Sequence, residues 1–274
     1  MAIVTFWSNN KKQTYQTASM AAIATSLVVN HNFKTLLLST EPKDTSLVDA
    51  FIDTSRDDFI KGIMGNKIDM AAGLDGLVKL YTTNKLNPES ITDYARIILK
   101  GNRLEILPAP EEEPEQPEIA LAAYKDVLLT AEKFYNIVFV DLSKGLDNDM
   151  SKQILEMSDL VVLTITQGIR EINSFIEARE SNPVLMSDKI ILSIGRYDNY
   201  SKYTVKNVAR ALGNKILPYT IPYNTLFFEA FNEGKLLDFF IKFANSTLPN
   251  SNTSFMTDVK TTKDALMQKL ADVR

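Results

Sequence analysis

The sequence predicts a doubly wound α/β fold, with a mostly parallel sheet of about seven strands and helices on both faces. Short, nearly continuous apolar runs recur along the chain, which is typical of strands that are buried on both faces of a parallel sheet. Amphipathic segments of helical length separate most of these runs, in the alternation that βαβ units need. The 274 residues are enough for one large domain of this kind.

Seven apolar runs are the candidate strands, at residues 3–7, 34–39, 103–110, 136–142, 160–166, 189–195 and 215–222. The expected helices are residues 17–30, 118–134, 148–157, 170–180 and 201–212. Residues 43–100 show no obvious strand, so we expect several short helices there. Residues 108–118, PAPEEEPEQPE, are acidic and rich in proline. We expect an exposed loop at this position, because the alternation of strands and helices resumes directly after it.

We expect an α/β domain over residues 1–244, followed by a linker and a C-terminal helix over residues 245–274. The apolar residues of this helix fall roughly on one face: Met256, Val259, Leu266, Leu270 and Val273. Two interpretations are open, because such a helix can dock on its own domain or can bind a partner or a membrane surface. Its mixed charges weaken the membrane interpretation.

Composition excludes several classes of protein. The chain has no cysteine, so disulfides and thiolate metal sites are excluded, and the single histidine, His31, cannot form a multi-histidine metal cluster. The net charge of −4 does not predict attraction of the whole molecule to nucleic acid. No basic leader and no apolar run of about 18 residues is present. We expect a cytoplasmic protein, with contact at the membrane periphery as the alternative.

Residues 8–17, SNNKKQTYQT, lie between the first strand and the first helix, where a phosphate-binding loop belongs. Such a loop uses glycines so that backbone N–H groups can surround the phosphates, and a lysine that reaches the terminal phosphates. This loop has no glycine, and Gln16 stands in the lysine place. Taken alone, it also fits an ordinary strand–turn–helix connection.

Other segments carry a family resemblance. The strand YNIVFVDL ends in Asp141, ILSIGRYD contains Arg196, and further motifs are TITQGIREINSF, IPYNTLFFEAFNEGKLLDF and GLDGLVKL…NPESITDY…RLEILPAP. In this order and spacing, residues 2–243 resemble the MinD/ParA family of deviant Walker ATPases, which are P-loop NTPases of the SIMIBI class. Within that family they look like the TadZ/CpaE branch, with a degenerate P-loop.

The resemblance implies a role for each matching residue of the loop. Lys11 takes the place of the family's signature lysine, which reaches the partner's nucleotide across a dimer. Lys12, Gln13 and Tyr15 take glycine places. Lys12 and Gln16 would then be nucleotide contacts. Thr17 would contact both the nucleotide and Mg²⁺.

The resemblance also implies roles beyond the loop. Asp141 would hold Mg²⁺ through water, and Glu41 would position the attacking water. Arg196 and Pro222 would lie on the nucleotide's adenine side, where Gly195 replaces the Asn with which the family reads adenine.

Ordinary structural roles remain open for the same residues. Thr17 could be the N-cap of the first helix, and Asp141 could cap a neighbouring turn. Lys11 and Lys12 could be solvated lysines of a polar turn, and Glu41 could be a loop acid.

The departures from the family pattern predict inefficient phosphoryl transfer. Gln16 carries no charge, so charge that develops on a phosphate loses its nearest cation. Side chains in the glycine places, such as Tyr15, prefer negative φ and crowd the space that phosphates need. We therefore expect no efficient ATP hydrolysis. Weak binding of ATP or ADP with Mg²⁺ and no nucleotide binding at all are equally compatible with the sequence.

Three functions compete. The first is a TadZ/CpaE-like localisation or assembly scaffold, a homodimer that binds a protein partner of a pilus or secretion machine in the cell envelope. The second is a ParA-type partition ATPase on DNA, for which the only suggestive basic set is Arg196, Lys202, Lys206 and Arg210. The third is a regulator that binds a protein or a membrane through its C-terminal helix. The acidic composition and the altered loop favour the first.

Overall fold

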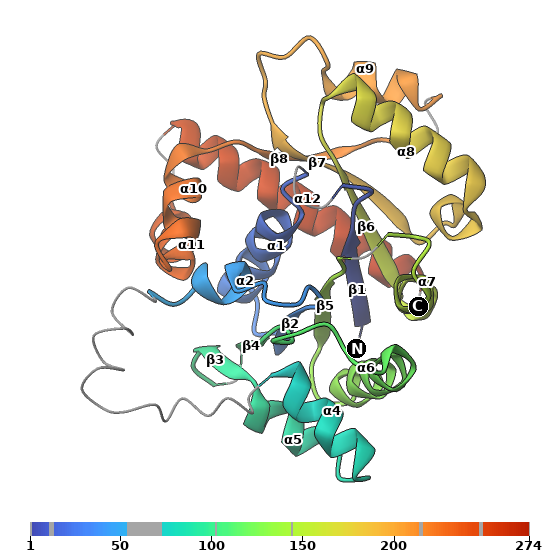
Figure 1. Ribbon diagram of the computed structural model, residues 1–274. Coiled ribbons are helices and arrows are strands. Elements are labelled where there is room, and N and C mark those ends of the chain that lie inside the picture. Colours follow the sequence, from blue (N-terminus) through green and yellow to red (C-terminus); the bar gives the residue numbers. More distant parts are fainter. Residues whose placement is uncertain are drawn as a thin grey trace.

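The computed structural model describes residues 2–10, 14–53, 73–101, 103–143, 145–213, 216–246 and 249–273. In this part of the chain eight strands form one sheet, in the order β3-β4-β2-β5-β1-β6-β7-β8 (Figure 1). The strands are β1 (Ala2–Trp7), β2 (Thr35–Ser39), β3 (Arg96–Leu99), β4 (Leu104–Leu107), β5 (Ile137–Asp141), β6 (Leu160–Ile165), β7 (Ile190–Tyr197) and β8 (Tyr219–Pro222).

All neighbouring strands are parallel except β3 and β4, which are antiparallel. The mostly parallel α/β sheet that the sequence predicts is therefore confirmed. The expectation of no strand in residues 43–100 was wrong, because β3 lies there. β3 has only four residues at the edge of the sheet, and its Ile97 is 59% exposed, so it lacks the buried apolar run by which the other strands are recognised.

Helices cover both faces of the sheet, as predicted. One face carries α1 (Gln16–Asn30), α2 (Ser46–Asp49), α10 (Thr225–Asn232), α11 (Leu236–Phe243) and α12 (Ser251–Val273). The other carries α4 (Leu74–Thr82), α5 (Pro88–Tyr94), α6 (Pro117–Glu132), α7 (Asp149–Met157), α8 (Ile169–Ser181) and α9 (Val205–Ala211). Figure 1 shows α1, α10 and α11 on one side of the sheet and α6, α7 and α8 on the other. The short helices expected in residues 43–100 are present as α2, α4 and α5, and residues 54–72 lie outside the described residues.

Helix α1 lies at the centre of its layer. Almost every residue from Gln16 to Val28 is buried, and the helix contacts both α11 and α12. Its sequence, QTASMAAIATSLVVN, is rich in alanine, which lets neighbouring helices and the sheet approach closely on all sides. This packing holds the first turn of α1 at the carboxyl ends of β1 and β5.

The motif IPYNTLFFEAFNEGKLLDF, residues 221–239, lies largely on the two helices α10 and α11. Asn224 caps α10 by accepting a hydrogen bond from the backbone N–H of Phe227 at 2.9 Å. The phenylalanines of α10 and α11 pack against one another, with the Phe227 and Phe239 ring centroids 5.9 Å apart. Aromatic burial thus orders a segment that the motif alone does not mark as helical.

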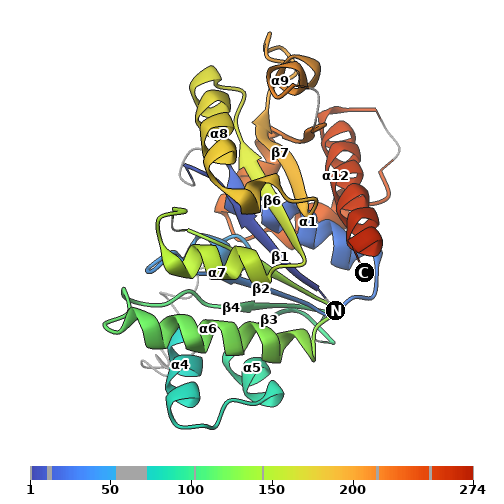
Figure 2. The ribbon, with the colours of Figure 1, turned by 90° about the vertical axis from the view of Figure 1, so that its right-hand side faces the viewer.

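Helix α12 docks on its own domain. Phe255, Val259, Leu266 and Leu270 are buried, whereas Val273 is 47% exposed. The Thr262 hydroxyl donates to the Thr220 carbonyl of β8 at 3.0 Å. Figure 2 shows α12 lying alongside α1. The apolar face of α12 is therefore part of the core, which is the first of the two interpretations given above. No helix in the described residues has the length and apolar character that crossing a bilayer requires.

Candidate functional site

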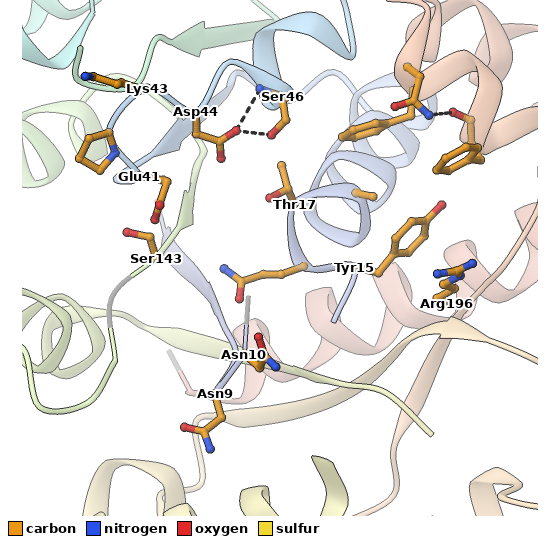
Figure 3. Close-up of a pocket in the computed structure, with 16 residues that line it drawn as sticks. Asn9, Asn10, Tyr15, Thr17, Glu41, Lys43, Asp44, Ser46, Ser143 and Arg196 are labelled. Atoms are coloured by element: carbon orange, nitrogen blue, oxygen red, sulfur yellow. Dashed lines mark hydrogen bonds between the residues drawn. The ribbon is translucent and has the colours of Figure 1, made fainter. Parts of the chain in front are cut away.

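A cavity of about 890 Å³ lies where the loop after β1 meets α1, at the carboxyl ends of the strands (Figure 3). This volume is within the range of small-molecule sites. Glu41, Asp44 and Ser143 lie on one side of Thr17, and Tyr15 and Arg196 lie on the other. The full lining is Asn9, Asn10, Tyr15, Gln16, Thr17, Ala18, Glu41, Pro42, Lys43, Asp44, Ser46, Ser143, Arg196, Phe228, Phe231 and Asn232.

Gln16, in the lysine place, uses its side-chain amide inside the protein. Its Nε2 donates to Asp141 Oδ1 at 2.6 Å, to the Leu142 carbonyl at 2.9 Å and to the Phe6 carbonyl at 3.0 Å. The residue is only 1% exposed. Gln16 therefore ties the start of α1 to the ends of β1 and β5, and its donor group faces the sheet.

Thr17 and Asp141 contact each other directly. The Thr17 hydroxyl donates to Asp141 Oδ2 at 2.6 Å, so both oxygens of this fully buried carboxylate accept bonds from α1. The N-cap role left open for Thr17 was wrong, because helix α1 starts at Gln16 with Tyr15 as its N-cap.

Tyr15 has a left-handed backbone, with φ 63° and ψ 27°. The expectation that a side chain in this place keeps φ negative was wrong, because tertiary packing holds the residue in a conformation that costs roughly 1–3 kcal/mol. Its ring packs edge-on against Phe227 with centroids 6.1 Å apart. Burial raises the pKa of Tyr15, and the nearby Arg196 charge opposes this shift. Within the described residues the Tyr15 hydroxyl has no hydrogen-bond partner.

The loop before α1 packs directly against the backbone of Gly195 on β7, where no side chain stands in its way. A Cβ built on Gly195 would lie 2.2 Å from the Thr14 carbonyl oxygen and 3.0 Å from Tyr15 Cβ. Because the loop backbone occupies this space, the Asn that the family has here would collide with it. Arg196 follows at a bulge with φ 52°, and its guanidinium lies 5.5 Å from the Tyr223 ring centroid.

The acidic side of the cavity contains one residue that sequence reasoning identified and one that it missed. Glu41, the predicted water-positioning acid, lines the cavity, and Asp44 lines it as well. Asp44 Oδ1 accepts from the backbone N–H of Ser46 at 3.0 Å and also from its hydroxyl. Asp44 could have been identified from the sequence, because it is a second acid three residues after Glu41 in the loop that follows β2.

Three further predicted residues are absent from the described lining of the cavity, for two different reasons. Pro222 is buried at the end of β8, opposite Tyr197 of β7, and does not belong to the cavity lining. Lys11 and Lys12 lie outside the described residues.

No protein-family model matches the chain, and no curated protein matches it. Solved structures do. A ParA family ATPase from Chlorobium tepidum TLS matches at 16% identity over 93% of this chain and 97% of that one, with a TM-score of 0.66. A plasmid partition protein from Borrelia burgdorferi B31, bound to AMPPNP, matches at 17% identity over 95% and 97%, with a TM-score of 0.64. MinD in the MinC:MinD complex of Aquifex aeolicus matches at 14% identity over 98% and 96%, with a TM-score of 0.65.

The chain has the ParA/MinD fold. Similarity at this level of identity establishes the architecture and nothing finer. The α/β class and the P-loop NTPase-like topology predicted from the sequence are thereby confirmed, while the TadZ/CpaE branch stays a prediction.

A nucleoside triphosphate fits the described part of this cavity poorly. Among the described lining residues the charges balance, since Lys43 and Arg196 face Glu41 and Asp44 around the same cavity. A triphosphate carries several negative charges, and the neutral Gln16 turns its donor group away from the space where they would lie. The Thr17 hydroxyl keeps lone pairs that could ligate a cation, and each oxygen of Asp141 already accepts one hydrogen bond from α1.

Proposed function

We propose that this chain is a ParA/MinD-fold scaffold that localises or assembles a cell-envelope machine, such as a pilus or secretion system, with little or no ATP hydrolysis. The hydrogen bonding of Gln16 supports this most strongly. Losing one electrostatic contact to a developing charge typically costs about 10²–10³ in rate. Here the charged contact of a lysine is lost. The side chain of Gln16, which replaces it, donates its hydrogen bonds inside the protein.

Nucleotide binding, in this proposal, is weak or absent. The ligands under consideration are ATP and ADP with Mg²⁺, for which Thr17, Arg196 and Glu41 line the available cavity. Isothermal titration of both nucleotides against the full chain tests this, with Thr17→Val as the variant that keeps the side-chain shape and removes the hydroxyl. The proposal predicts either no heat of binding or a heat of binding that saturates only at millimolar nucleotide. Micromolar binding that Thr17→Val abolishes would argue for a nucleotide-driven switch instead.

The scaffold would act as a homodimer with a protein partner in the cell-envelope machine, and it would reside in the cytoplasm or at the membrane periphery. One neighbour in fold, MinD of Aquifex aeolicus, is in a complex with MinC. Since the apolar face of α12 is buried in the core, a partner would have to use other surfaces unless α12 undocks.

A partition ATPase on DNA is the second candidate, and one observation favours it. Lys202, Lys206 and Arg210 are all exposed, and the last two lie on α9. Titration of labelled duplex DNA at several salt concentrations separates the candidates, because phosphate contacts give affinity that falls steeply with salt. Tight, salt-dependent binding would favour the partition function.

A further inference from the structure

The first residues of β7 have a strand beside them on one side only. β8 pairs with β7 from Ser193 onward, where Tyr219 lies opposite. Ile190, Ile191 and Leu192 therefore have a strand neighbour on β6 and none on β8. We call residues 190–192 the open edge of β7. Because it is at the amino end of the strand, it lies at the opposite end of the parallel sheet from the cavity described above.

The backbone of Ile190 shows which way the open edge faces. The Lys189 carbonyl accepts from the backbone N–H of Val161 on β6 at 2.8 Å, so the N–H and carbonyl of the next residue, Ile190, point away from β6. The Ile190 carbonyl accepts from Lys269 Nζ of α12 at 2.9 Å. A side chain of α12 thus takes the place of a strand donor. Among the described residues, the Ile190 N–H has no recorded hydrogen-bond partner.

A groove of about 610 Å³ lies between the open edge and α12. Two large apolar side chains at the groove are partly in solvent, since Leu217 is 65% exposed and Val273 is 47% exposed. An extended peptide that pairs with a strand edge needs a groove of this kind, because its alternate side chains require pockets. The described lining is Asp188, Ile190, Ile191, Leu192, Ile216, Leu217, Tyr219, Ala265, Gln268, Lys269, Asp272 and Val273.

The charges of the described lining favour a cationic ligand. Asp188 and Asp272 are both exposed. Lys269 is the one cation among the described lining residues, and its ammonium is bound to the Ile190 carbonyl. A lysine or arginine side chain would therefore meet two carboxylates in this groove, whereas a polyanion such as nucleic acid would be repelled.

We propose that this groove docks an extended segment of a partner protein, which pairs with the open edge of β7 and carries apolar side chains and a lysine or arginine. The inference rests on the proposed scaffold role, for which it supplies the surface that binds the partner. The segment accepts a hydrogen bond from the Ile190 N–H and donates one to the Ile190 carbonyl, which has a second lone pair beside the one that Lys269 uses. Helix α12 stays docked, because the groove does not involve its buried face.

Selection of displayed random short peptides on the full wild-type chain tests this, followed by fluorescence anisotropy with the synthetic selected peptides. We expect these peptides to combine apolar residues with lysine or arginine. Two groove variants, Leu217→Asp and Asp188→Lys/Asp272→Lys, should each bind them about tenfold or more weakly. The first puts a charge against the apolar side chains of the peptide, and the second repels its basic residue.

The matched controls make the same changes at exposed positions elsewhere. Leu226→Asp alters a leucine of α10, and Glu112→Lys/Glu115→Lys reverses two acids of the loop before α6. Both controls should bind the selected peptides as the wild type does. Equal weakening of the controls would contradict the proposal, because binding would then depend on overall charge or apolar surface and not on the groove.

Hydrogen exchange of the wild-type chain, followed by NMR, gives a readout that needs no variant. When a selected peptide binds, exchange of the Ile190 amide should slow about tenfold or more, because its N–H gains a hydrogen bond. Unchanged exchange at Ile190, wild-type affinity in both groove variants, or a selection without any groove-dependent peptide would overturn the proposal. None of these measurements involves nucleotide, so their failure leaves the proposal of little or no ATP hydrolysis standing.

Discussion

Gln16 occupies a position where a ligand-binding lysine is expected, but its side chain connects elements of the fold to one another. A lysine in this place could extend toward a ligand, whereas the amide of Gln16 reaches three acceptors at the ends of β1 and β5. Spacing from Thr17 identified this position from the sequence. The direction of the side chain could not be predicted, because it depends on carbonyls of Phe6 and Leu142 that only the folded sheet brings together.

Glu105 on β4 gives a prediction that is independent of the site. It is fully buried, accepts a hydrogen bond from the Tyr135 hydroxyl through Oε2, and has no described partner for Oε1. Burial raises the pKa of Glu105 above 4.5, so the folded chain keeps a proton that the unfolded chain releases. The free energy of unfolding should therefore fall as pH rises from about 4.5 through the raised pKa.

Glu105→Gln should remove this part of the pH dependence. The variant should gain stability relative to the wild type as pH rises above about 4.5, because it has no carboxylate to ionise in the core. Urea unfolding at a series of pH values measures this. Parallel pH profiles for both proteins would show that Glu105 is not the group responsible.

Strands and helices with long buried runs were predicted well, and elements defined by tertiary contacts were not. The run NIVFVDL became β5, buried at all five positions. β3 was missed because an antiparallel edge strand of four residues carries no periodic signal. The left-handed bend at Tyr15 was missed because sequence preference alone argues against it, and the contact of its loop with β7 overrides that preference.

The contact between this loop and β7 predicts a sharp effect of Gly195→Ala. The new methyl group would lie 2.2 Å from the Thr14 carbonyl oxygen, so the loop or the strand has to shift. We expect a loss of about 2–3 kcal/mol in the free energy of unfolding. Gly168→Ala is the matched control, since its methyl group would meet Thr166 Oγ1 at an ordinary 3.4 Å. Equal stability of the two variants in chemical denaturation would refute the close packing.

At the scale of the whole molecule, α12 is part of the hydrophobic core of the domain. The Phe255 ring lies 4.7 Å from the Phe227 ring by centroids, and Phe255 is 1% exposed. The sequence predicted the apolar stripe of this helix. It could not decide between docking and partner binding, because an amphipathic face looks the same in either case.

Phe255→Ala should therefore destabilise the entire domain by about 3–5 kcal/mol, as large-to-small changes in a packed core do. Phe228→Ala removes the same ring from a site that is 45% exposed and should cost much less. Thermal unfolding followed by circular dichroism compares the two variants. If Phe255→Ala unfolded at the wild-type temperature, α12 would be an appendage and its apolar face would be available to partners.

The measurement that tests the account most directly is steady-state phosphate release from Mg-ATP by the purified wild-type chain, beside Gln16→Lys and Thr17→Val. Because the Gln16 amide is bound to Asp141 and to two carbonyls, wild-type release should not exceed the rate without protein, and Thr17→Val should not change it. Release by the wild type that Thr17→Val abolishes would contradict the account, because the cavity would then be a working ATPase site despite Gln16.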